Sequence, residues 1–149
     1  MRKQLNKREI EEFSEKISKY KIAFNKKDRM EIIDNKLLAI NGVASFFLID
    51  DEWIPTLKYI LNNQILKTIT VDMGAVKFVV SGADIMRPGI VAWDDFAKDE
   101  IVAVIDEKNK KPLAIGKILV SAGELSSMKT GKTVKNLHWV GDDIWNIST

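Results

Sequence analysis

Residues 71–89 read VDMGAVKFVVSGADIMRPG, and this stretch carries the strongest structural signal in the chain. Three glycines and one proline punctuate its nineteen residues. Glycine is unfavourable inside regular elements, so this density indicates tight turns or the close approach of another backbone. The apolar residues between the glycines indicate that the segment also contributes to a core. We therefore predict the end of a strand, a short helical turn and a return into a second strand.

The bulk composition bounds the class of protein. The chain has 149 residues and a hydrophobic content of 46%, which is enough to bury a core and argues against disorder. It holds no cysteine, which excludes disulfides and any thiolate metal site supplied by this chain. The first residues lack the apolar region of a secretory signal, and no apolar run approaches transmembrane length. A cytoplasmic protein with no membrane partner is expected.

The residues before this stretch predict a small α+β unit. Asn6 is a candidate N-cap, and four apolar residues then recur at the spacing of one helix face: Ile10, Phe13, Ile17 and Tyr20. Short apolar runs separated by turn residues predict three strands, over 30–34, 36–40 and 43–49. Residues 50–52 are expected to form an exposed loop. Residues 53–61 are expected to form a helix with Pro55 near its first turn.

Short strand patterns dominate the residues after the stretch. Strands are expected over 90–93, 100–105 and 113–120, followed by a closing pair over 133–140 and 144–147. Gly116 within one strand predicts a bulge or a sharp bend. Ser121 and Glu124 have the spacing of a capping box, which predicts a short helix ending at Gly131. Together these elements predict a small closed or partly closed barrel.

Charge is unevenly distributed although the formal net charge is only +2. Seven acidic and two basic residues lie within 84–107, whereas seven lysines and one acidic residue lie within 108–135. A domain polarised in this way can present a basic face to a nucleic acid at a neutral total charge. An ordinary solvated surface with the same alternation is an equally good interpretation of the charges alone.

Three motifs in the second half resemble a PUA domain, the RNA-binding pseudo-barrel of pseudouridine synthases and archaeosine transglycosylases. They are VDxGA at 71–75 with SGADIMxPG at 81–89, IG at 115–116, and NLHWxxDxxW at 136–145. The segment WIPTL at 53–57, with an α+β unit ahead of it, extends the resemblance to nearly the full chain. The whole is similar to the malignant T-cell amplified sequence family of ribosome-associated translation factors.

The resemblance implies a fold, a domain division and partners. The fold class is α+β, with a pre-PUA domain over 1–66 and a PUA β-pseudo-barrel with short helices over 67–149. The expected partner is structured RNA, either ribosomal or transfer RNA, on the small ribosomal subunit during initiation and recycling. A protein similar to the density-regulated protein is a further expected partner. No cofactor is expected.

The candidate RNA-binding residues combine small residues with nearby cations. Glycine and alanine let a phosphate or ribose approach the backbone, and basic side chains contact phosphates without reading sequence. By the resemblance, the helix and loop of the opening stretch hold the RNA together with the terminal strands. The expected residues are Gly74, Ala75, Lys77, Gly82, Ala83, Arg87, Lys132 and Lys135.

Structural interpretations of the same residues remain open. The glycines also suit plain turns, and Lys77 also suits a solvated helix face. The tryptophans Trp93, Trp139 and Trp145 favour core positions over base stacking. The single histidine, His138, lacks a visible partner for metal binding or catalysis and is interpreted as structural.

The sequence offers no catalytic constellation. It contains no cysteine nucleophile, phosphate-binding GxxxxGK[ST] loop or GxGxxG fingerprint, so a non-enzymatic role is expected. Three functions remain. The first is an RNA-binding protein acting on the ribosome or initiator tRNA. The second is an accessory RNA-binding subunit of an RNA-modifying, pseudouridine synthase-like enzyme, and the third is a protein-interaction module.

Overall fold

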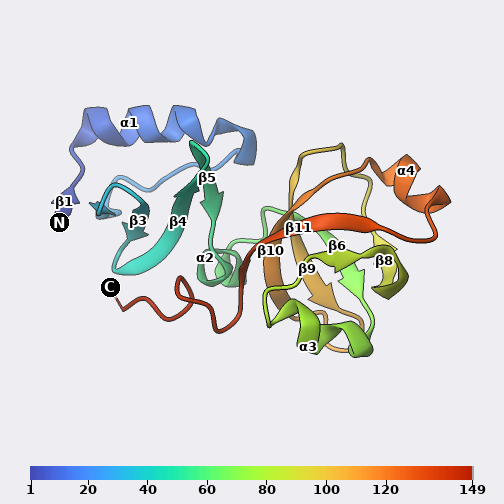
Figure 1. Ribbon diagram of the computed structural model, residues 1–149. Helices are drawn as coiled ribbons and strands as arrows, with labels where there is room; N and C mark the ends of the chain where they lie inside the picture. Colours follow the sequence, from blue (N-terminus) through green and yellow to red (C-terminus); the bar gives the residue numbers. More distant parts are fainter. Residues whose placement is uncertain (149) are drawn as a thin grey trace. The chain divides into compact units, whose positions relative to one another are not determined.

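The computed structural model describes residues 1–148, which fold into two compact units (Figure 1). Within the described residues, the first unit comprises Met1–Ile65 with Ile147 and Ser148, and the second comprises Leu66–Asn146. Each unit combines one β-sheet with short helices, so the fold class is α+β, as predicted.

The first unit is a five-stranded sheet in the order β1-β2-β3-β4-β5, with every neighbouring pair antiparallel. Its elements are β1 Arg2–Gln4, α1 Lys7–Lys16, a 3₁₀ turn Ser18–Tyr20, β2 Met30–Ile33, β3 Leu37–Ile40, β4 Val43–Ile49, β5 Glu52–Pro55 and α2 Leu57–Asn62. Asn6 caps α1, as expected from the sequence, and Glu9 completes a capping box that was not predicted. The buried ring of Phe13 on α1 packs edge-on against Phe46 and Trp53, which fixes the helix on the sheet.

Two expectations for this unit were incomplete or wrong. The helix predicted over 53–61 begins only at Leu57, because residues 52–55 pair with β4 as strand β5. The acidic pair Asp50 and Asp51 adopts positive φ angles of 49° and 61° and forms the tight turn of this hairpin. Thr56 then caps the helix by accepting the Tyr59 N–H at 3.1 Å. Strand β1 was not predicted.

The second unit is a six-stranded sheet in the order β7-β11-β10-β9-β6-β8, curled into a partly closed barrel (Figure 1). Its elements are β6 Lys67–Val71, a 3₁₀ turn Met73–Ala75, α3 Val76–Val79, β7 Ile85–Met86, a 3₁₀ turn Arg87–Gly89, β8 Ile90–Trp93, β9 Ile101–Asp106, β10 Pro112–Ile118, α4 Ala122–Ser127 and β11 Lys132–Trp139. The strands enclose one apolar cluster, to which Trp93 and Trp139 also contribute. The stretch over 71–89 therefore has the predicted strand, helical turn and second strand.

Gly116 produces the predicted bulge in the middle of the barrel. The register of β10 with β11 shifts between Ile115 and Gly116. A Cβ at position 116 would lie 2.4 Å from Val134 Cγ1 and 2.8 Å from the Lys135 carbonyl oxygen. Only glycine lets β11 come this close to β10.

The end of the barrel differs from the prediction. The strand expected over 144–147 is wrong, because within residues 1–148 the chain beyond β11 forms turns. The Asp142 carboxylate accepts the backbone N–H of Trp139 at 3.0 Å and that of Trp145 at 2.8 Å, which folds this segment back on itself. His138 is fully buried, and its Nδ1 lies 2.8 Å from Asp142 Oδ2, a partner that the sequence did not reveal. The helix expected to reach Gly131 ends at Ser127.

Candidate functional site

An open cavity of about 520 Å³ lies on the second unit, and all of its lining residues fall between Asp72 and Gly89. The walls come from the 3₁₀ turn and α3 on one side and from β7 and the turn after it on the other. Most of the lining is apolar, with Asp72 and Asp84 as its two acidic members. The stretch over 71–89 thus forms the whole lining of this cavity.

Exposed apolar side chains make this cavity a candidate binding surface. Phe78 on α3 is 58% exposed and Met86 on β7 is 49% exposed, and both line the cavity. Clusters of large apolar side chains exposed to solvent are unusual unless they contact a partner. The Lys77 ammonium lies 5.1 Å from the centre of the Phe78 ring, so a cation accompanies the aromatic face.

Local hydrogen bonds close the two ends of the stretch onto each other. Asp72 donates its backbone N–H to the Gly89 carbonyl at 2.9 Å, and its carboxylate accepts the Ala75 N–H at 2.9 Å. Gly82 has φ +92°, and a Cβ there would lie 2.7 Å from the Trp139 ring. Glycine at 82 is therefore required both by its backbone angle and by the tryptophan beneath it.

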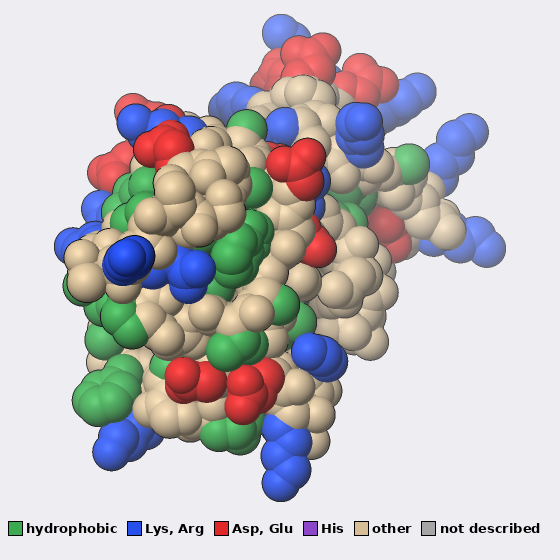
Figure 2. Space-filling view, turned by 90° about the vertical axis from the view of Figure 1, so that its right-hand side faces the viewer, with side chains coloured by type: hydrophobic (Ala, Val, Ile, Leu, Met, Phe, Trp, Pro, Cys, Tyr) green, Lys and Arg blue, Asp and Glu red, His purple; other side chains and the backbone are tan. Residues whose placement is uncertain are grey.

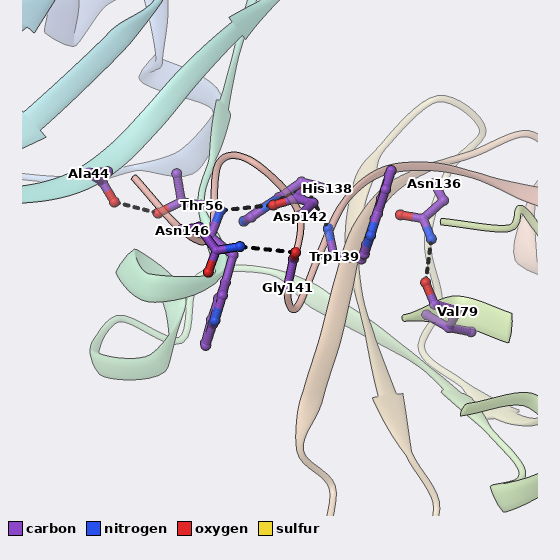
Figure 3. Close-up of polar contacts among 10 residues, drawn as sticks. Ala44, Thr56, Val79, Asn136, His138, Trp139, Gly141, Asp142 and Asn146 are labelled. Atoms are coloured by element: carbon purple, nitrogen blue, oxygen red, sulfur yellow. Dashed lines mark hydrogen bonds and ion pairs between the residues drawn. The ribbon is translucent and has the colours of Figure 1, made fainter. Parts of the chain in front are cut away.

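Hydrogen bonds from Asn136 on strand β11 hold the chain around residues 79–84, which lines part of the cavity. The Asn136 side-chain amide donates to the Val79 and Ala83 carbonyls, each at 3.0 Å, and its backbone N–H donates to Asp84 Oδ1 at 2.9 Å. Figure 3 shows this amide reaching from β11 to the end of α3. The Asn136 Oδ1 atom is buried and accepts no hydrogen bond within the described residues. The loop that carries Gly82 is thus held by a side chain more than fifty residues away.

An ion pair adds a second contact between β11 and the cavity lining. The Lys132 ammonium lies 2.8 Å from Asp84 Oδ2. Burial acts to raise the pKa of Asp84, but the hydrogen bonds from Lys132 and from the Asn136 N–H outweigh it and hold that pKa below its ordinary value. Asp84 is therefore a charged anchor between β7 and β11.

The predicted site residues divide into those that line the cavity and those that lie outside its lining. Gly74, Ala75 and Ala83 line it. Gly82 and Lys77 are not among the lining residues, but each is the chain neighbour of one, Ala83 and Phe78 respectively, and the Lys77 side chain is exposed.

Three predicted cations have different settings. Lys135 is exposed on β11, whereas Lys132 is paired with Asp84. Arg87 turns inward: its Nε donates to the Leu125 carbonyl at 3.0 Å and its Nη1 to the Ile90 carbonyl at 3.2 Å. The predicted site residues did not include Phe78, Met86 or Asn136, although Asn136 is the first residue of the motif at 136–145.

Lysine and arginine side chains project at several places around the edge of the face drawn in Figure 2, with acidic side chains lying between them. Within residues 1–148, no group of three or more His, Asp or Glu side chains is placed to hold a metal ion. No helix in the described part of the chain has the length and apolar character needed to cross a membrane.

Comparisons with known proteins agree with this architecture. Residues 67–140 match the PUA domain family, and residues 1–63 match a domain family of unknown function, DUF1947. An uncharacterized protein of Methanocaldococcus jannaschii is 41% identical over 145 residues, covering 94% of this chain and 88% of that protein.

Two eukaryotic relatives also match along most of their length. Translation machinery-associated protein 20 of Saccharomyces cerevisiae is 35% identical, covering 83% of this chain and 75% of its own. Malignant T-cell-amplified sequence 1 of Rattus norvegicus is 33% identical, covering 83% and 74% respectively. Among solved structures, a hypothetical protein of Pyrococcus horikoshii superposes with a TM-score of 0.84 at 29% identity, covering 100% of both chains.

Proposed function

The chain belongs to the family of malignant T-cell-amplified sequence proteins and translation machinery-associated protein 20, and we propose on this basis that it binds structured RNA in translation without catalysing a reaction. The RNA site that we propose is the cavity over 72–89 in the second unit. The observation that carries this proposal is an exposed aromatic ring, Phe78, beside an exposed lysine at the mouth of a largely apolar hollow.

The chemistry of the cavity suits an unpaired nucleotide next to a helical stem. Base–aromatic stacking on a ring such as Phe78 tolerates any base and is worth about 1–3 kcal/mol. The backbone at Gly74 and Ala75 leaves room for a sugar or phosphate, and Lys77 and Lys135 supply positive charge close by. Recognition of this kind depends on shape and on phosphate positions, with little reading of sequence.

The names of the relatives guide the choice of RNA. We propose that the RNA is ribosomal RNA of the small subunit or a transfer RNA, engaged in the cytoplasm during initiation or recycling. We assign RNA contact to residues 67–149. We assign the docking of a protein partner similar to the density-regulated protein to residues 1–66.

Fluorescence anisotropy with a labelled tRNA and with small-subunit rRNA fragments tests the cavity. Phe78→Ala should weaken binding by about 5- to 150-fold, given the stacking energy above. Val91→Ala is the matched control, because Val91 is a 49% exposed apolar side chain outside the cavity lining. Lys77→Ala should weaken binding and reduce its dependence on salt. Arg87→Ala is a poor probe, because it removes internal hydrogen bonds.

Sedimentation through a gradient then tests the cellular setting. The full chain should travel with small ribosomal subunits at low salt and leave them as salt rises. Equal affinity of Phe78→Ala and wild type would refute the cavity as the site. Failure of wild type to bind tRNA or rRNA at low salt would refute RNA binding and favour a protein-interaction module. Co-purification with an RNA-modifying enzyme in place of ribosomal subunits would favour the accessory-subunit function.

A further inference from the structure

The turn between β9 and β10 gathers three lysines outside the site described above. Residues 107–111 read Glu-Lys-Asn-Lys-Lys, and all five are exposed. None of Lys108, Lys110 and Lys111 takes part in an ion pair within residues 1–148. We call residues 107–111 the lysine turn. Its cations are available to an external anion.

A buried carboxylate fixes the conformation of the lysine turn. Asp106 is only 3% exposed, and its carboxylate accepts the Asn109 N–H at 2.6 Å and the Lys111 N–H at 3.1 Å. The Lys110 N–H donates to the Asp106 carbonyl at 3.0 Å, and Lys110 itself adopts φ +56°. A turn that is already ordered loses little conformational entropy when it binds.

The lysine turn begins beside the cavity. Strands β6 and β9 run parallel with Val71 opposite Asp106, and the Glu107 N–H donates to the Val71 carbonyl at 3.0 Å. The next residue after Val71 is Asp72, the first member of the cavity lining. Paired strands lie about 4.8 Å apart, so the turn starts about one strand spacing from the cavity wall. Figure 1 shows β9 running toward the end of the second unit where α3 lies.

We propose that the lysine turn binds the sugar–phosphate backbone of the same RNA strand or stem that the cavity engages. This inference rests on the proposed RNA-binding function and adds to it a second contact that carries no sequence information. Lysine ammonium groups are compact point charges that suit phosphate oxygens. The lysine turn supplies affinity and orientation, whereas the cavity holds the nucleotide.

Salt-dependent anisotropy on the full chain tests the proposal. Each phosphate contact contributes a slope of about 0.7–0.9 to the plot of log affinity against log salt. The triple variant Lys108→Ala, Lys110→Ala, Lys111→Ala should lower that slope by about two and weaken binding at low salt by about tenfold or more. The corresponding triple arginine variant should keep both the slope and the affinity. All three side chains are exposed, so the melting temperature should be unchanged in either variant.

A matched single substitution separates a local contact from a general effect of charge. Lys98 is exposed, takes part in no ion pair of the described residues and precedes the opposite end of β9. Lys110→Ala should weaken binding and lower the slope, whereas Lys98→Ala should do neither. Equal effects of these two variants would overturn the proposal.

The failure of this proposal is distinguishable from failure of RNA binding itself. If wild type binds RNA and Phe78→Ala weakens it, but the triple alanine variant keeps its affinity and slope, the lysine turn is not a contact and the proposed function stands. If wild type binds no structured RNA at low salt, both proposals fall.

Discussion

Gly116→Ala isolates the contact on which closure of the barrel depends. The added methyl group would lie 2.4 Å from Val134 Cγ1 and 2.8 Å from the Lys135 carbonyl oxygen, so β11 must move away from β10. Overpacking of this kind costs about 1–3 kcal/mol. Replacing glycine also restricts the unfolded chain, which returns about 0.4–1 kcal/mol. The net loss of unfolding free energy should be about 1–2 kcal/mol.

Thermal unfolding followed by circular dichroism measures this loss. For a domain of this size, about 1–2 kcal/mol corresponds to a fall in melting temperature of about 5–15 °C. Gly123→Ala makes the same chemical change in α4, where the nearest atom to the new Cβ lies 3.9 Å away. That control should be neutral or stabilising by a few tenths to about 1 kcal/mol, because alanine favours helix.

Gly116→Ala should therefore lower the melting temperature, whereas Gly123→Ala should leave it unchanged or raise it. A Gly116→Ala protein that melts at or above the wild-type temperature would refute the close approach of β11 to β10. A fall of the same size in both variants would show that alanine acts through something other than this contact.

Two further substitutions test the polar contacts of the second unit. Asp106→Asn should lower stability at neutral pH, and its difference from wild type should shrink as pH falls below the ordinary carboxyl pKa of 3.8. The hydrogen bond from the backbone N–H of Asn109 is the main cause that lowers the pKa of Asp106. The stabilisation by the charged carboxylate is therefore fully present above pH 3.8 and is lost as pH falls through the native pKa. Urea unfolding at several pH values measures this dependence. Arg87→Ala should lower the free energy of unfolding measured in urea by about 2–4 kcal/mol, because it leaves the Leu125 and Ile90 carbonyls without their guanidinium donor. A loss below about 0.5 kcal/mol would contradict these two hydrogen bonds.

Local patterns in the sequence predicted the elements that local forces define. The helix after Asn6 and the short helix after Ser121 have capping boxes within four residues, and both form. Strand β5 was missed because Pro55 near a helix start is a common pattern, whereas pairing with β4 decides the conformation there. The turn at 50–51 was the available signal, since consecutive aspartates tolerate positive φ as Asp34 and Asn35 do.

The candidate site was predictable only in part for the same reason. The glycine density located the stretch over 71–89, and the resemblance identified it as the opening of a PUA barrel. Which way each side chain turns depends on partners that are remote in sequence. Arg87 was predicted as a phosphate contact, and its part-buried guanidinium donates to the carbonyl of Leu125, 38 residues away in the sequence. Whether any of the predicted residues contacts RNA stays a prediction.

Strand β11 connects the packing of the barrel to the wall of the candidate site. Gly116 on β10 is paired in register with Asn136 on β11, the residue whose amide holds the Val79 and Ala83 carbonyls. The close approach that glycine allows thus sets the position from which Asn136 reaches the cavity wall. Displacing β11 by a few tenths of an ångström would lengthen the hydrogen bonds from the Asn136 amide to the Val79 and Ala83 carbonyls. The Asn136 Oδ1 atom has no hydrogen-bond partner within the described residues that could compensate. A substitution chosen to weaken the barrel at Gly116 should therefore also loosen the cavity while the chain remains folded.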